Sequence, residues 1–287
     1  MQEIAPHIYI ETGYAGVTLG AINWPHGLIL IDAPFRAEDA RSWRSTLLNL
    51  SGGIDRILIN MDSHLDRTLG VRAMECTVVG HENMIRVFRN RPVTFKAQTS
   101  DTGADWEQHN GLGSIRWAPP EITFTDQLNV HWDSGSPLYL QHRPGPTGDA
   151  IWAVLPEQGI VFIGDCVVAG RPPFLAGADL EEWRKNLAVL ASPEYHNYLM
   201  ISGRSGLVSQ NDVHRQAQLL EKIHAQLEEL AAAGAAPEET EKLVPALLAG
   251  FNPPAAERTW LHNRLRHGLA TYYLRHYQAH NGEVGEE

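Results

Sequence analysis

The chain has 287 residues, of which 43% are hydrophobic and 20% charged, a composition typical of a folded globular protein. Its formal net charge of −11 argues against a nucleic-acid partner, because binding to phosphate backbones calls for a basic surface. No signal-like N-terminus, no apolar run near the ~20 residues of a membrane span and no CxxC motif is visible. We therefore expect a cytoplasmic protein with no membrane partner.

The first third of the chain alternates between short apolar segments and amphipathic ones, the pattern of a layered α/β domain. Strands are expected at residues 7–11, 17–22, 27–32, 56–60 and 76–80. Helices are expected at residues 37–50 and 81–89.

Residues 90–120 carry little periodicity and are rich in Gly and Pro. A long irregular segment of this kind is either a lid or substrate loop, or a surface insertion. Beyond it, strands are expected at residues 128–132, 138–142, 150–155, 160–163 and 199–202. A helix is expected over 179–191, with Asp179 as its N-cap and Glu182 completing a capping box by position.

After Ser209 the pattern becomes helical, with helices expected at 211–233, 238–249 and 255–280. We therefore divide the chain into an α/β domain over 1–208 and a C-terminal helical appendage over 209–287. An aromatic stripe in the C-terminal helices favours core packing or a dimer face over a cofactor site, so a homodimer stays open; it consists of Trp260, Tyr272, Tyr273 and Tyr277.

The most informative segment follows the strand over 56–60. It reads Asp62-Ser63-His64-Leu65-Asp66-Arg67, with Gly70 shortly after. This loop resembles the metal-binding loop of the metallo-β-lactamase superfamily, His-x-His-x-Asp-His. Here Asp62 stands at the first His position and Arg67 at the last.

Further segments resemble the superfamily in its usual order along the chain. They are Ile31-Asp32-Ala33-Pro34, Val79-Gly80-His81-Glu82, His142-Arg143-Pro144-Gly145-Pro146-Thr147, Phe162-Ile163-Gly164-Asp165 and Ile201-Ser202-Gly203-Arg204-Ser205-Gly206. The resemblance implies the αββα four-layer sandwich of that superfamily, with Asp32 supporting the metal loop. The C-terminal helices would be an appendage to this sandwich.

The departures from the superfamily pattern fall on its zinc ligands. Carried over by position, the first zinc site would hold Asp62, His64 and Pro146. The second would hold Asp66, Arg67 and Arg204, with Asp165 bridging the two. Proline offers no side-chain donor, and arginine does not lose its proton to become a ligand. The sequence thus predicts that the dinuclear zinc centre is missing.

The positive charges that the substitutions introduce offset most of the negative charge of the remaining carboxylates. Three carboxylates remain, those of Asp62, Asp66 and Asp165, and two guanidinium groups have appeared, those of Arg67 and Arg204. Buried carboxylates must be paired, and guanidinium groups can pair with them through two parallel hydrogen bonds. We infer that the arginines stand where the second metal would be and neutralise Asp66 and Asp165.

The residues at the first zinc position allow two interpretations. Asp62, His64 and Asp165 could hold a single divalent ion (Zn, Mn or Mg), since carboxylate oxygens suit Mn²⁺ and Mg²⁺. Alternatively Asp62 and His64 form a hydrogen-bonded pair without metal, the reading we favour. We expect His142 to lie outside the site, Cys166 to be a buried inert thiol, and His81 to be a packing or capping residue.

Three functions follow from these readings. The first is a non-catalytic protein, or one that binds a small anionic ligand through Arg67 and Arg204. The second is a hydrolase of an ester, lactone, amide or phosphoester that uses one metal at the Asp62–His64–Asp165 cluster. The third is metal-free acid–base chemistry, with Asp62 or Asp66 as the base beside His64 and the two arginines stabilising an oxyanion.

Overall fold

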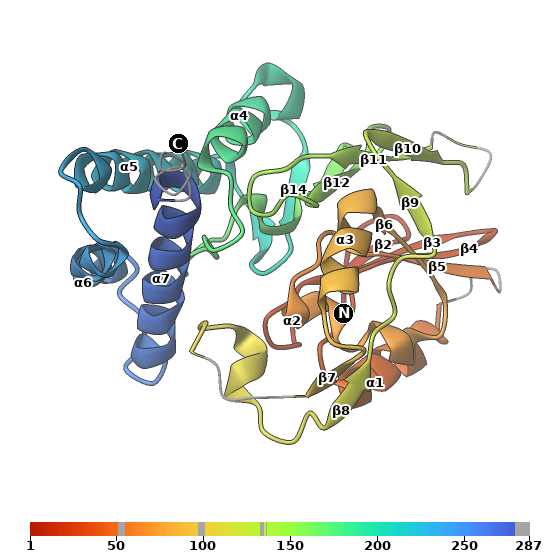
Figure 1. The fold of residues 1–287 in the computed structure, drawn as a ribbon. Helices are drawn as coiled ribbons and strands as arrows, with labels where there is room; N and C mark the ends of the chain where they lie inside the picture. The colour runs from red at the N-terminus through yellow and green to blue at the C-terminus, as the bar shows by residue number, and fades with distance from the viewer. Residues whose placement is uncertain (51–54, 97–100, 133–134, 136, 279–287) are drawn as a thin grey trace, which may run out of the picture.

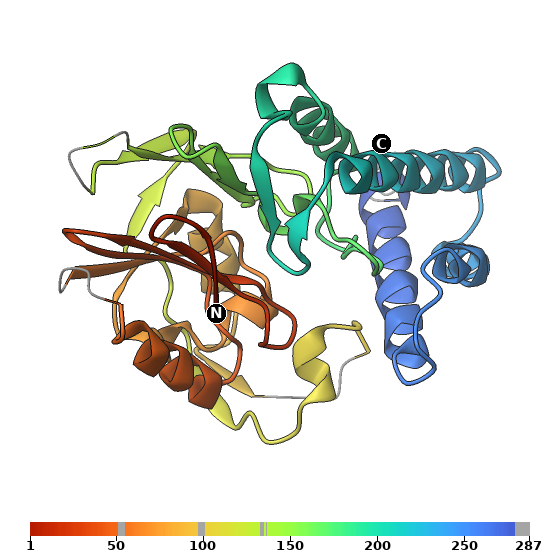
Figure 2. The ribbon, with the colours of Figure 1, turned by 180° about the vertical axis from the view of Figure 1, so that it is seen from behind.

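The computed structural model describes residues 1–50, 55–96, 101–132, 135 and 137–278. Within them, two mixed β-sheets pack face to face and helices cover their outer faces (Figure 1). This is the αββα sandwich that the sequence predicts. The C-terminal helices α5, α6 and α7 lie together beside the sandwich in both views (Figure 2).

The first sheet carries the N-terminal part of the chain. Its strands in spatial order are β1 (Gln2–Ala5), β2 (Ile8–Glu11), β3 (Leu19–Trp24), β4 (Gly27–Ile31), β5 (Asp55–Ile59), β6 (Thr77–His81) and β9 (Ile122–Phe124). From β4 to β9 neighbouring strands run parallel, so their carboxyl ends meet at one edge of the sheet. Ligands and catalytic groups collect at such an edge in α/β proteins.

The second sheet follows the chain order. Its strands are β10 (Gln127–Val130), β11 (Leu138–His142), β12 (Ile151–Leu155), β13 (Ile160–Phe162), β14 (Leu199–Ser202) and β15 (Gly206–Val208). β13 and β14 are parallel, and the other neighbours in this sheet are antiparallel. The parallel pair delivers Asp165 and Arg204 from its carboxyl ends to one side of the molecule.

Strand alternation explains the layers. On β4, Leu28 and Leu30 pack with Trp43 of α1, whereas Ile29 and Ile31 enter the cluster between the two sheets. Successive side chains point to opposite faces of a strand, so a strand buried on both faces reads as a continuous apolar run. Burial of each such side chain contributes about 2 kcal/mol.

The helical elements follow the predicted order. They are α1 (Ala37–Leu47), α2 (Leu65–Thr68), η1 (Val71–Met74), α3 (Glu82–Asn90), η2 (Asp105–Gln108), η3 (Gly164–Cys166), α4 (Leu180–Leu190), η4 (Pro193–Tyr195), α5 (Gln210–Ala232), η5 (Pro237–Leu243), α6 (Val244–Ala249), α7 (Arg258–Tyr273) and η6 (Leu274–Gln278). The predicted N-cap of α4 is confirmed, because Asp179 Oδ1 accepts from the backbone N–H of Glu182 at 3.0 Å. Each helix of the described residues is too short or too polar to cross a membrane.

Two predicted C-terminal helices differ from the structure. The helix expected over 238–249 is a 3₁₀ segment, η5, followed by α6. Pro245 lies in the first turn of α6, where its missing N–H is tolerated, but it would break a continuous helix. The helix expected over 255–280 begins at Arg258 and changes to a π turn after Tyr273; residues 279 and 280 lie outside the described part of the chain.

The segment predicted to be irregular has structure of its own. β7 (Thr94–Lys96) and β8 (Ser114–Arg116) form a small antiparallel ribbon. Between them, η2 buries Asp105 and Trp106. Trp106 packs with Phe35 and Leu69 in a separate hydrophobic cluster. The segment is therefore anchored to the molecule through the buried stretch at residues 103–106, whereas most of its other described residues are exposed or half-buried.

The aromatic stripe of the last helix packs inside the molecule. Tyr272 and Tyr273 are buried in the cluster shared by α4, α5 and α7. The hydroxyl of Tyr273 donates to the carbonyl of Ala235 at 2.9 Å, and that of Tyr277 donates to Glu228 at 2.7 Å. These contacts attach α7 to α5 and to the turn after it, as the core-packing interpretation expects.

Candidate functional site

Asp32 fixes the loop that carries the motif. It follows β4 in a left-handed conformation, with φ of 58°, which aspartate tolerates better than most residues. Its Oδ1 accepts from the backbone N–H of Met61 at 2.9 Å and from Asn60 Nδ2 at 3.4 Å. These bonds hold the start of the loop against the end of the neighbouring strand, the supporting role that the resemblance implies for Asp32.

Arg67 lies at the centre of the site and is 0% exposed. Its Nη1 lies 3.0 Å from Asp32 Oδ2, its Nε lies 3.2 Å from Asp62 Oδ1, and its Nη2 donates to Asp165 Oδ1. A Cβ on Gly203 would lie 2.9 Å from Nη1, so a side chain at Gly203 would displace the guanidinium group. The loop geometry thus leaves room for an arginine enclosed by carboxylates.

Arg204 approaches Asp165 from the other side. Its Nε donates to Asp165 Oδ2 at 2.7 Å, and its Nη1 donates to Asp66 Oδ2 at 2.9 Å. Asp66 Oδ1 accepts from the backbone N–H of Trp106 at 2.8 Å. The ion pairs expected between the two arginines and the carboxylates of Asp66 and Asp165 are therefore present, and both oxygens of Asp66 are engaged.

Burial and ion pairing pull the carboxyl pKa values in opposite directions. Burial opposes ionisation of Asp165, but Arg204 and Arg67 outweigh it and hold its pKa below the usual range. The pKa of Asp62 is likewise lowered, because Arg67 and His64 outweigh its burial. At Asp32 burial dominates and raises the pKa to about 6. Burial, together with the charge of Asp66, raises the pKa of Asp105.

Sequence reasoning missed two residues of this network. Asp105 comes from the irregular segment, and Arg264 comes from α7, where it is 1% exposed. Arg264 Nη2 lies 3.0 Å from Asp105 Oδ2, and Nε donates to the carbonyl of Gly103 at 2.8 Å. The signal was present, because Arg264 falls on the apolar face that includes Leu261 and Leu265. A charged residue on such a face is expected to have a buried partner.

Phe174 packs against the cations of the site. Its ring centroid lies 4.5 Å from Cζ of Arg204 and 4.1 Å from Cζ of Arg264. The ring centroid of His64 lies 5.2 Å from that of Phe174. The aromatic ring therefore joins the motif loop, the segment after β14 and the C-terminal helix into one cluster.

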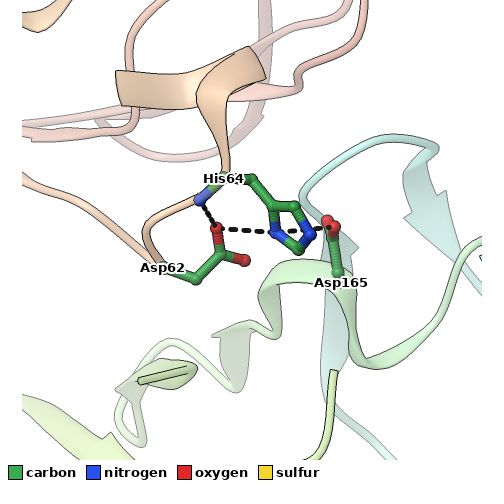
Figure 3. A group of neighbouring side chains, drawn as sticks. All are labelled: Asp62, His64 and Asp165. Atoms are coloured by element: carbon green, nitrogen blue, oxygen red, sulfur yellow. Dashed lines mark hydrogen bonds and ion pairs between the residues drawn. The ribbon is translucent and has the colours of Figure 1, made fainter. Parts of the chain in front are cut away.

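The predicted Asp62–His64–Asp165 cluster is assembled (Figure 3). His64 Nδ1 lies 3.0 Å from Asp62 Oδ1 and 3.6 Å from Asp165 Oδ2. One potential ligand atom from each residue lies within 4.8 Å of the others. Asp62 Oδ2 is buried without a hydrogen-bond partner among the described residues. The Asp62–His64 pair that we favoured from the sequence is present, and the same cluster could also hold one cation.

A dinuclear zinc centre does not fit these residues. Pro146 has no donor atom, and the guanidinium groups of Arg67 and Arg204 occupy the lone pairs of Asp165. His142 does not fill the gap, because it stacks on His81 at 3.7 Å between ring centroids and its Nε2 contacts the carbonyl of Gly148. His81 Nδ1 accepts from the N–H of Asn83 as the N-cap of α3, which confirms its capping role.

Comparison with known proteins finds likeness in structure only. No protein-family model matches the chain, and no curated protein does. A metallo-β-lactamase from Pontibacter korlensis is 19% identical with a TM-score of 0.61, over 77% of this chain and 97% of its own. The sec-alkylsulfatase Pisa1 from Pseudomonas sp. is 15% identical with a TM-score of 0.67. That match covers 98% of this chain, which spans half of the sulfatase.

The metallo-β-lactamase FIM-1 from Pseudomonas aeruginosa, in its mono-zinc form, is 19% identical with a TM-score of 0.57 over 77% of this chain. These likenesses and the two-sheet architecture define the class: the chain has the fold of the metallo-β-lactamase superfamily. Within that class, the sequence resemblance implies that Asp62, Arg67, Pro146 and Arg204 stand at the positions of four histidine ligands.

Proposed function

We propose that this protein has the metallo-β-lactamase fold without the dinuclear zinc centre, and that its buried site is held together by ion pairs rather than used for two-metal hydrolysis. The observation that carries the proposal is Arg67, buried between Asp32, Asp62 and Asp165. Metal ligands must offer a lone pair, and arginine stays protonated in proteins.

The charges of the network support the same conclusion. Among the described site residues, the carboxyl groups of Asp32, Asp62, Asp66, Asp105 and Asp165 face the guanidinium groups of Arg67, Arg204 and Arg264, and Arg171 lies 3.4 Å from Asp105 as well. Burial raises the pKa of Asp32 to about 6, and burial together with the charge of Asp66 raises the pKa of Asp105, so these two carboxyl groups hold a proton more readily than exposed ones do. The guanidinium groups thus balance most of the carboxylate charge from within the protein, which lessens the need for a divalent ion.

The proposal allows a small anionic ligand to bind at one hydrogen-bond donor of the site. The terminal nitrogens of Arg67 are engaged by Asp32 and Asp165, whereas Nη2 of Arg204 is buried without a hydrogen-bond partner in the described chain. A buried donor without an acceptor costs about 1–3 kcal/mol. A carboxylate or phosphate oxygen that reaches Arg204 Nη2 would recover that cost, so we assign anion recognition to Arg204 more than to Arg67.

A mononuclear metal hydrolase is the second candidate. It is favoured by the unpartnered Asp62 Oδ2 and by the clustering of Asp62, His64 and Asp165 within 4.8 Å. Those three residues would hold the ion, which would activate a water molecule when bound. Arg67 opposes it, because its Nε lies 3.2 Å from Asp62 Oδ1 and repels a second cation there.

Metal analysis decides between the two candidates. The chain is produced without a polyhistidine tag, and its content of zinc, manganese and magnesium is measured by elemental analysis before and after dialysis against Zn²⁺. The same measurement is made on His64→Gln and on the matched control His142→Gln, which alters a histidine outside the cluster.

We expect substoichiometric metal in all three proteins, and thermal stability that does not respond to Zn²⁺. One equivalent of metal in the wild type and in His142→Gln, lost in His64→Gln, would overturn the proposal in favour of the mononuclear site. Titration with inorganic phosphate tests the anion: we expect wild-type stability to rise with phosphate and the rise to shrink in Arg204→Lys, which lacks Nη2.

A further inference from the structure

A separate pocket of about 400 Å³ lies between α5, α6 and the loop at residues 168–170. Its wall is largely apolar and includes Leu219, Leu247 and Phe251. None of the ion-paired site residues lines it. Its volume lies within the range of small-molecule sites, which are mostly apolar with a few placed polar groups.

Gln216 is the placed polar group of this pocket. It is 3% exposed, and its Oε1 accepts from the backbone N–H of Val168 at 3.3 Å. That backbone donor fixes which way the amide points, so the NH₂ group is the end without a protein partner. Gln216 Nε2 is buried and has no hydrogen-bond partner in the described part of the chain. An acceptor atom inside the pocket would satisfy it.

The rim of the pocket is basic. Arg215 and Lys222 lie seven positions apart on α5, hence on one face of the helix, and both line the pocket. Asp212 lies 3.5 Å from Arg215, but its oxygens also accept from Ser209 in the capping box of α5. Lys222 forms no ion pair with a described residue. Positive charge at the rim of a pocket in a chain of net charge −11 favours an anion.

We propose that this pocket binds an organic anion with an apolar body, such as a medium-chain carboxylate. The alkyl chain of the ligand lies against Leu219, Leu247 and Phe251. One oxygen of its carboxylate accepts from Gln216 Nε2, and the negative charge of that carboxylate faces Arg215 and Lys222. For a ligand of this size we expect a dissociation constant of about 1 mM, since a small ligand makes few contacts and loses rigid-body freedom on binding.

The test is calorimetric titration of the protein with octanoate. Acetate, which keeps the carboxylate but lacks the long alkyl chain, and 1-octanol, which keeps the alkyl chain but lacks the charge, serve as comparison ligands. Ala246→Phe places a ring in the pocket from an exposed position of α6 and leaves the core unchanged. Gln216→Leu removes the buried donor, with Gln218→Leu on the exposed face of α5 as its matched control. Lys222→Glu reverses the rim charge, with Lys96→Glu as its control.

We expect saturable binding of octanoate and about tenfold weaker binding of acetate and 1-octanol. Gln216→Leu and Lys222→Glu should each weaken octanoate by about fivefold to tenfold, Ala246→Phe should abolish it, and the controls should bind as the wild type does. No saturation at about 10 mM, or undiminished binding in Ala246→Phe, overturns the proposal. The protein could instead be a dimer that does not bind octanoate and that Ala246→Phe dissociates. That result would assign the pocket to a second copy of this chain and would also overturn the proposal.

Discussion

Arg204 Nε lies 2.7 Å from Asp165 Oδ2, while Arg67 contacts the other oxygen of the same carboxylate. The sequence resemblance implies for Asp165 the position of the aspartate that bridges two metals in the superfamily. In the structure, two guanidinium groups contact the two oxygens of this carboxylate. The charge of the carboxylate is therefore balanced inside the protein, and its pKa is lowered by arginines.

Removal of Arg67 should destabilise the fold strongly. In Arg67→Ala, the buried carboxyl groups of Asp32, Asp62 and Asp165 lose a shared cation, and loss of one partner from a buried ion pair costs about 3–5 kcal/mol. Urea denaturation measures the loss. The control Arg86→Ala removes an exposed arginine of α3 and should change stability by less than about 0.5 kcal/mol. A loss below about 1 kcal/mol in Arg67→Ala would show that the network does not stabilise the fold.

Histidine at both arginine positions should restore a zinc site. The double variant Arg67→His with Arg204→His frees the carboxylates of Asp66 and Asp165 and supplies two imidazoles beside them. Carboxylate and imidazole form a suitable zinc ligand set. We expect about one equivalent of Zn²⁺ per chain and a melting temperature that rises with zinc. The matched control is Arg67→Ala with Arg204→Ala; equal zinc in the two double variants, or none in the histidine variant, contradicts the prediction.

The fold could be predicted from the sequence because apolar patterns and motif segments follow the chain. The run Gly27–Ile31 is apolar throughout, which indicates a strand buried on both faces, and the structure places it between α1 and the second sheet. Arg67 and Arg204 were found because they occupy the positions of known ligands in a recognisable motif. Their pairing with Asp66 and Asp165 followed from charge alone.

The rest of the site depends on contacts between distant parts of the chain. Asp105 and Arg264 are 159 positions apart, and neither belongs to a motif. No local pattern reports that η2 and α7 meet at the network. The division into a sandwich and an appendage also directed attention away from Arg264, because it led us to seek the site in residues 1–208.

The Arg264–Asp105 ion pair should couple the C-terminal helix to the site. A double-mutant cycle with Arg264→Met and Asp105→Asn isolates the interaction between the two residues from their other contacts. The pair is buried and its nitrogen–oxygen distance is 3.0 Å, so we expect a coupling energy of about 1.5–3 kcal/mol. The same cycle on the exposed pair of Lys185 and Glu181 should give about 0.5 kcal/mol or less. Additive losses at Asp105 and Arg264 would mean that this ion pair does not couple the helix to the site.

The pH dependence of stability should carry the signature of Asp32. Burial raises the pKa of this carboxyl from 3.8 to about 6, so the folded state holds the proton more tightly than the unfolded chain does. The resulting stabilisation is complete below about pH 3.8 and is lost as the pH rises through about 6. The pKa values of Asp62 and Asp165 are lowered, so their contribution is present at neutral pH and is lost as the pH falls below about 3.8.

A comparison of the wild type with Asp32→Asn separates the pH range in which Asp32 contributes to stability from the range of Asp62 and Asp165. The free energy of unfolding of the wild type minus that of Asp32→Asn should fall by about 2.4 kcal/mol between pH 4 and pH 7, most of the energy that a shift of about two pKa units represents. Urea denaturation at half-unit pH steps measures the difference. Glu38→Gln, which changes an exposed carboxyl of α1, is the control and should give a flat difference. A flat or rising difference for Asp32→Asn would show that Arg67 and the N–H of Met61 hold Asp32 ionised throughout this range.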